Sequence, residues 1–171
     1  MEEEINFRNV CHFHETSRLY GLSEVEKSCV KWLESNIMLR TKEASFLAQI
    51  KPKLMSQIVR SPDLFVLQVE MDVYTLLKKW LFLQLDPNHR TVDEKNLSAT
   101  ASKFFQDKFK ATGKAFLDAE EGAPYVEAFQ ALRLCNVIGE FGCCAEVTIE
   151  SFVFFPLQGF AKDAWFTPTI C

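Results

Sequence analysis

The chain has 171 residues, 48% of them hydrophobic and sixteen of them phenylalanine, with a net charge of −4 and an isoelectric point of about 5.5. So much apolar material excludes a disordered chain, and the acidic balance argues against nucleic acid as a partner, because surfaces that bind nucleic acid are usually basic. No stretch approaches ~18 uncharged apolar residues, so we expect no insertion into a membrane. The acidic start MEEEINF is not a signal peptide, and we expect the six cysteines to be free thiols in the reducing interior of a cell.

Two helices joined by a tight turn are predicted for the start of the chain. Asn6 can cap a helix over residues 7–20, which Gly21 ends. Ser23-Glu24-Val25-Glu26 has the form of a capping box and predicts a second helix over 23–38. The apolar residues of this helix recur at four-residue spacing: Val25, Cys29, Leu33 and Ile37. The two helices should form an antiparallel hairpin.

Two shorter helices are predicted next. Thr41 can cap a helix over residues 42–50, and Pro52 suits the first turn of the following helix. The apolar residues of that second helix are Leu54, Met55, Ile58 and Val59. Ser61-Pro62-Asp63 breaks it, and an apolar connector over 64–67 leads onward.

The segment from Gln68 to Leu85 predicts the helix around which the others pack. Its apolar residues follow three- and four-residue spacings: Val69, Val73, Leu76, Leu77, Trp80, Leu81 and Leu83. We expect them to form one wide buried face, with Glu70, Lys78 and Lys79 on the opposite, charged face. The fold class predicted is therefore all-α, a stack of antiparallel helix hairpins with about seven or eight helices.

The second half continues the helical pattern as far as residue 142. A polar loop over 86–93 is followed by a predicted helix over 94–110, a mostly loop segment over 112–124 and a helix over 125–141. The inward residues of these helices are Leu97, Ala101, Phe104, Phe105 and Phe109, and then Val126, Phe129, Leu132, Leu134, Val137 and Ile138. We place a helical domain at 1–142 and an aromatic-rich extension packed on it at 143–171.

The extension carries weak periodicity and many aromatic residues. An extended connector over 147–155 is favoured over a short strand, and 158–166 predicts a final short helix. The aromatic residues are Phe152, Phe154, Phe155, Phe160, Trp165 and Phe166. They either close the open end of the helical stack or form a patch that takes a peptide from a partner, since interfaces favour large aromatic side chains.

Several segments together resemble the BACK domain that follows the BTB domain in Kelch-like cullin-3 adaptors, and most of all the BACK region of the germ cell-less family. The segments are YGLSEVEKSCVKWL in the first hairpin, VEMDVYTLLKKWLFLQL in the central helix and PYVEAFQALRL near residue 130. The positions that follow the BACK pattern are Glu70, Val73-Tyr74, Leu76-Leu77 and Trp80, with Ser61-Pro62-Asp63-Leu64 as the preceding turn. The resemblance covers residues 5 to 140 well and the tail loosely.

This resemblance implies a developmental protein that recruits substrates to a cullin-3 ubiquitin ligase and acts in germ cell formation. It implies a receptor tyrosine kinase as the substrate to be degraded, and the nuclear envelope or cell cortex as the location. The acidic start leads us to expect an excised fragment without its BTB domain, so that cullin-3 would bind only when that domain is supplied. Phe7, Val10 and Phe13 are the residues we expect near the cullin, and packing against the second helix and the missing BTB domain is an alternative that is at least as well supported.

Catalytic and metal chemistry have little support in the sequence. Cys11-His12-x-His14 is the nearest approach to a metal cluster, but neighbours on a helix point about 100° apart, and structural zinc needs four convergent ligands. We expect a core cysteine with surface histidines there. Cys143-Cys144 has no nearby histidine to activate a thiolate. We therefore expect no enzyme, metal or cofactor, with a structural spacer as the alternative to a substrate recruiter.

Overall fold

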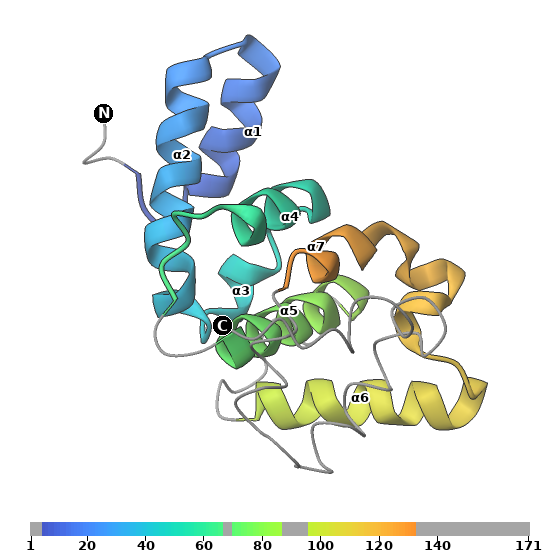
Figure 1. Ribbon diagram of the computed structural model, residues 1–171. Helices are drawn as coiled ribbons and strands as arrows, with labels where there is room; N and C mark the ends of the chain where they lie inside the picture. The colour runs from blue at the N-terminus through green and yellow to red at the C-terminus, as the bar shows by residue number, and fades with distance from the viewer. Residues whose placement is uncertain (1–4, 67–69, 87–95, 133–171) are drawn as a thin grey trace, which may run out of the picture.

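The structure, a computed structural model, describes residues 5–66, 70–86 and 96–132, and all regular secondary structure in these ranges is helical (Figure 1). The α-helices are α1 Val10–Tyr20, α2 Ser23–Asn36, α3 Ala44–Leu47, α4 Pro52–Arg60, α5 Glu70–Leu85, α6 Leu97–Thr112 and α7 Val126–Gln130. Short 3-10 helices are η2 Ile37–Arg40, η4 Phe116–Asp118 and η5 Glu120–Tyr125. The prediction of an all-α protein is confirmed for this part of the chain.

The helices are arranged around α5. In Figure 1, α6 runs along one side of α5, while α3, α4 and α7 cover the other side. Helices α1 and α2 lie side by side as an antiparallel hairpin that extends away from this group. The structure therefore has a packed body around α5 and a projecting hairpin at its N-terminal end.

The first helix is shorter than predicted because Asn6 forms a turn of its own. The Asn6 Oδ1 atom accepts a hydrogen bond from the backbone N–H of Arg8 at 3.0 Å, and the Asn6 carbonyl accepts one from Val10 at 2.9 Å. Helix α1 consequently begins at Val10. Its predicted end at Gly21 is confirmed: Gly21 has φ 68°, and the N–H of Leu22 donates to the carbonyl of Ser17 at 2.8 Å, as in a Schellman motif.

The predicted capping box at Ser23 does not form. Helix α2 has Leu22 at its N-cap position and no side-chain cap, because Ser23 itself is the first helical residue. The N–H of Glu26 donates instead to the Leu22 carbonyl at 3.0 Å. At the other end, α2 stops at Asn36 and the chain tightens into η2.

Among the short helices, α4 follows the prediction and α3 does not. Helix α3 has four residues, with Glu43 rather than Thr41 at its N-cap position and no side-chain cap. Helix α4 has Pro52 in its first turn and ends at Arg60, before Ser61-Pro62-Asp63. Its four predicted apolar residues are buried: Leu54, Met55, Ile58 and Val59.

Helix α5 is enclosed on more than the one face that its sequence predicted. The predicted apolar residues from Val73 onward are buried, and so are Tyr74 and Phe82. Lys78, expected on a solvated face, is only 4% exposed and its Nζ atom lies 5.5 Å from the centre of the Tyr74 ring. Lys79 is half-buried, and burial lowers its pKa, with Lys42 and Lys78 acting in the same direction. Neighbouring elements thus cover Lys78 and part of Lys79 as well.

Side-chain hydrogen bonds join α5 to the segment after α3. Trp80 Nε1 donates to the carbonyl of Ile50 at 2.8 Å, and Gln84 Nε2 donates to the carbonyl of Ala48 at 3.0 Å. The Trp80 ring also packs edge-on against Tyr125, with centroids 5.6 Å apart. Trp80 therefore contacts residues that precede α4 and residues that precede α7.

The segment after α6 is more ordered than its loop prediction. Residues 112–124 include η4 and most of η5, and Phe116 and Leu117 are buried in the core. Gly122 packs so tightly that a Cβ atom there would lie 2.2 Å from the Phe116 carbonyl oxygen. Of the residues predicted to face inward on α6, Leu97, Ala101 and Phe105 are buried, whereas Phe104 and Phe109 are half-buried.

Some predictions lie outside the described residues. These are the loop over 87–93, the helix beyond residue 132, the domain boundary at residue 142 and the whole aromatic extension. The extension includes every predicted aromatic contact residue of the tail: Phe152, Phe154, Phe155, Phe160, Trp165 and Phe166.

Candidate partner-binding site

The three predicted contact residues of the hairpin occupy three different environments. Phe7 is half-buried before α1, with the guanidinium groups of Arg8 and Arg40 over its ring at 5.4 and 5.1 Å from the centroid. Val10 is completely buried, so it is a core residue and presents no surface to a partner in this structure. Phe13 is half-buried and lines a groove. The structure therefore leaves Phe7 and Phe13 as the members of this set that a partner can reach.

The groove beside Phe13 is open and mainly apolar. It has a volume of about 280 Å³ and lies where α1, the turn at Leu22 and the first half of α2 meet the segment before α1. The residues that line it are Ile5, Phe13, Thr16, Ser17, Leu22, Glu24, Val25 and Ser28. A groove of this kind suits an apolar side chain of another protein better than a charged small molecule.

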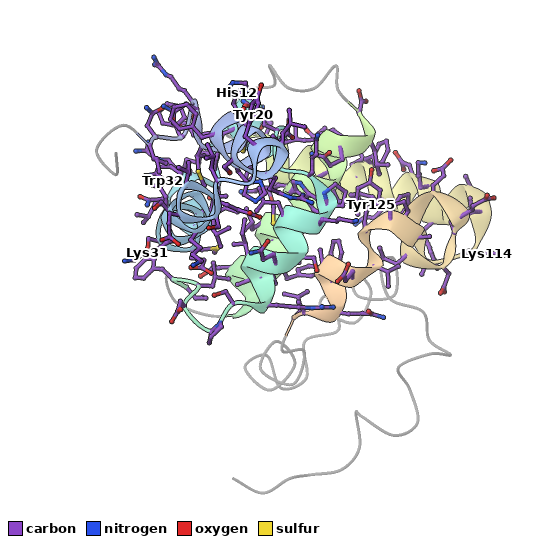
Figure 2. All side chains as sticks on the ribbon, turned by 90° about the horizontal axis from the view of Figure 1, so that it is seen from above. His12, Tyr20, Lys31, Trp32, Lys114 and Tyr125 are labelled. Carbon is purple, nitrogen blue, oxygen red and sulfur yellow. The ribbon has the colours of Figure 1, made fainter. Side chains whose placement is uncertain are left out.

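Beside the groove, the turn between α1 and α2 exposes a cluster of large apolar side chains. Leu19 is 79% exposed, Tyr20 is 71% exposed and Leu22 is 51% exposed. The Schellman turn at Gly21 fixes the backbone that carries them. We call these three residues the hairpin tip. It is located at the end of the hairpin farthest from α5, as the ribbon shows (Figure 1), and the label on Tyr20 in Figure 2 marks it from above.

The hairpin tip was not among the predicted contact residues. Leu19, Tyr20 and Leu22 are apolar residues at helix ends, and apolar spacing alone does not distinguish such residues from core residues. The signal was the stop at Gly21, since the residues that flank a tight turn cannot all reach the hairpin interface. Single exposed apolar residues are ordinary, whereas three at one turn are a concentration of exposed apolar side chains.

The inner face of the hairpin contains a histidine where the sequence predicted a surface residue. His12 is exposed as expected, but His14 is only 3% exposed and packs between α1 and α2. Cys11 and Cys29 are free, buried thiols on the same face, as predicted. Burial raises the pKa of Cys11 to about 12, with Glu15 and Cys29 adding to the effect, so this cysteine stays protonated and unreactive.

No candidate metal site is found in the part of the chain that the structure describes. In residues 5–66, 70–86 and 96–132, no three His, Cys, Asp or Glu side chains lie where they could share a metal ion. No helix within these ranges is long and apolar enough to cross a membrane. The hairpin tip and the groove beside Phe13 are apolar surface within these ranges.

The described residues thus define an all-helical protein with a projecting hairpin suited to protein contact. The chain is a homologue of germ cell-less proteins over most of its length. It is 35% identical to human germ cell-less protein-like 1, covering 97% of this chain and 32% of the relative. It is 37% identical to mouse germ cell-less protein-like 1, and this match covers 90% of this chain and 29% of the relative. It is 30% identical to the Drosophila melanogaster protein germ cell-less, and this match covers 78% of this chain and 27% of the relative.

These comparisons confirm the predicted closeness to the germ cell-less family. The chain spans about a third of the length of these curated relatives. No protein-family model matches the chain, and no solved structure matches it. The names of the relatives mention neither a BACK nor a BTB domain.

Proposed function

We propose that this chain is the BACK region of a BTB-type adaptor for a cullin-3 ubiquitin ligase, and that it recruits a substrate for degradation. The observation that carries the proposal is the homology of nearly the whole chain to germ cell-less proteins. The resemblance of the first hairpin and of α5 to BACK domains supplies the ligase connection. Its role is positioning rather than chemistry: it holds a bound protein within reach of a ligase that acts elsewhere.

The hairpin is the proposed ligase-facing part. Its apolar groove and the hairpin tip lie side by side, since Leu22 belongs to both. An apolar segment of a partner that covers both would bury large side chains at low entropic cost. In this proposal, a BTB domain packs beside the hairpin and the N-terminal segment of cullin-3 lies between the two.

The aromatic extension is the proposed substrate-facing part. Trp165 and its neighbouring phenylalanines take a peptide from the substrate, for which we propose a cytoplasmic segment of a receptor tyrosine kinase. The resulting degradation would act in germ cell formation, at the nuclear envelope or the cell cortex.

A pull-down with this chain tests substrate recruitment. The immobilised chain is incubated with peptides tiled across the cytoplasmic segments of receptor tyrosine kinases. We expect at least one peptide to be retained and to be lost with Trp165→Ala, but kept with Tyr20→Ser in the hairpin tip. The alternative function, a spacer between a BTB dimer and a separate substrate module, predicts that no peptide is retained.

A second experiment tests the ligase-facing role of the hairpin. The chain is joined to a BTB domain and titrated with the N-terminal segment of cullin-3. Tyr20→Asp should weaken this binding at least tenfold, because a carboxylate would replace an aromatic ring that the bound partner buries. Leu39→Asp is the matched control: Leu39 is an apolar residue, 56% exposed, in η2 beyond the far end of α2. Equal weakening by both variants would contradict a specific role for the tip.

A further inference from the structure

The interface between α1 and α2 contains a titratable group with an unfilled hydrogen-bonding position. The side chain of His14 is 4% exposed, and its Nε2 atom has no hydrogen-bond partner, the one buried side-chain atom of the described residues in this condition. A buried polar atom without a partner costs free energy, and native structures contain few of them. The hairpin interior therefore leaves one hydrogen-bonding position of His14, the Nε2 atom, without a partner.

The charged groups around His14 give it one carboxylate neighbour, which lies beyond hydrogen-bonding distance. The nearest is Glu26 on α2, whose Oε1 atom lies 3.9 Å from His14 Nε2, too far for a hydrogen bond. Arg18 on α1 competes for the same oxygen, with its Nε atom also 3.9 Å away. Glu15, one residue along α1, is paired with Lys51 at 2.7 Å. Glu15 is thus paired with Lys51, and Glu26 lies equally far from His14 and from Arg18.

This arrangement tolerates a neutral imidazole and disfavours a charged one. A proton on His14 would place a cation in the hairpin interior with one carboxylate that it shares with Arg18. Burial is the largest effect on the pKa of His14 and lowers it. The positive charge of Arg18 also lowers this pKa, whereas the negative charges of Glu26 and Glu15 raise it. The lowered pKa agrees with the burial of the imidazole and with the carboxylate that it shares with Arg18.

We propose that His14 makes the α1–α2 hairpin sensitive to acid: when its imidazole takes up a proton, α1 loosens from α2 while the body around α5 stays packed. An opened hairpin exposes the imidazole to water, where it binds a proton near its ordinary pKa of 6.5. Because the pKa is lower in the closed hairpin, the closed form is favoured fully above pH ~6.5. That preference is lost progressively as the pH falls from there toward the lowered pKa.

Amide hydrogen exchange in the whole chain measures this opening locally. Protection factors, which are corrected for the intrinsic pH dependence of exchange, are compared for α1 and for α6 between pH 7.5 and pH 5. We expect protection in α1 to fall by up to tenfold per pH unit below 6.5, with little change in α6. The readout involves no partner, so it stands or falls independently of the proposed function.

Three variants identify the group responsible. His14→Gln cannot take up a proton, so the loss of α1 protection in acid should disappear, whereas His12→Gln, at an exposed position two residues earlier, should keep it. Glu26→Gln removes the nearest negative charge, so the ring resonances of His14 should titrate at a lower pH than in the unaltered chain. A pH dependence that survives His14→Gln unchanged would overturn the proposal. So would a titration of His14 at or above pH 6.5.

Discussion

Helix α5 and the α1–α2 hairpin are both rich in apolar residues, yet they use them in opposite ways. From Val73 to Leu83, every large apolar side chain of α5 is buried, and Lys78 is buried with them. The hairpin buries Val10, Cys29 and Leu33 but leaves the three residues of its tip in water. The apolar residues of α5 hold the body together, whereas those of the tip contribute little to folding and remain available for a partner.

The comparison teaches that composition alone does not separate a core helix from a docking element. The separation comes from how many elements surround each helix. Helix α5 contacts α3, α6, α7 and η2, while α1 packs chiefly against α2. A helix with one neighbour has one buried stripe, and its ends remain exposed.

The largest effect should follow Trp80→Ala. This change removes a fully buried indole, its edge-on contact with Tyr125 and its hydrogen bond to the Ile50 carbonyl. Loss of a buried tryptophan costs roughly 3–5 kcal/mol, so urea denaturation should show a strongly lowered midpoint or no folded protein. Trp32→Ala on the hairpin, where the ring is half-buried against Phe46, should cost less. Equal losses from the two variants would erase the proposed contrast between body and hairpin.

A smaller effect in the body should follow Gly122→Ala. The added Cβ atom would lie 2.2 Å from the Phe116 carbonyl oxygen, so η4 and η5 would have to move apart. Overpacking of this kind costs about 1–3 kcal/mol, measurable as a shift in thermal unfolding. Gly113→Ala tests a different cause, because its surroundings are open and only its φ of 66° opposes a side chain, at about 1 kcal/mol. An unchanged melting temperature for Gly122→Ala would show that the two short helices are not rigidly packed.

A modest effect should follow Arg60→Gln at the surface of the body. Arg60 on α4 pairs with Glu127 on α7 at 3.1 Å, and both side chains are more than half exposed. Exposed pairs contribute about 0.2–1 kcal/mol, so chemical denaturation should detect a small loss that shrinks in high salt. Glu127→Gln should give the same loss, and the double variant no more. Additive losses would mean that the two residues act separately.

The smallest effect on stability should follow Tyr20→Ser in the hairpin tip. The ring is 71% exposed, so the free energy of unfolding should change by less than about 0.5 kcal/mol. This variant completes the contrast, because Trp80→Ala removes an aromatic side chain of the body at a far greater cost. A loss above ~1 kcal/mol would place Tyr20 in the folded core after all.

The sequence predicted best where apolar spacing and helix stops agree. Helix α4 begins at Pro52, α1 ends at Tyr20 before Gly21, and α5 ends at Leu85. The start of α4 and the end of α1 depend on backbone geometry that Pro52 and Gly21 impose locally. Helix interiors with regular apolar spacing were predicted equally well, because three- and four-residue periods leave few alternatives to a helix.

What the sequence did not reveal depends on tertiary neighbours. Ser23 had a suitable partner in Glu26, yet the Schellman turn at Gly21 places Leu22 at the start of α2. Lys78 lies opposite the main apolar face, and only the packing of neighbouring elements buries it. Phe116 and Leu117 sit in a segment with the composition of a loop, and the contact of Gly122 with η4 makes it part of the core. The exposure of the hairpin tip depends on the geometry of the turn at Gly21, which apolar spacing alone does not give.

The hydrogen bonds of Trp80 and Gln84 limit where the chain can be cut into fragments that still fold. They join α5 to carbonyl groups 30 and 36 residues earlier in the chain, beside a helix of only four residues. A shortened chain that ended at residue 66 would leave both carbonyls without these donors, and α3 is too short to persist alone. Dissection for crystallography or for a split reporter should therefore keep residues 44–85 in a single piece.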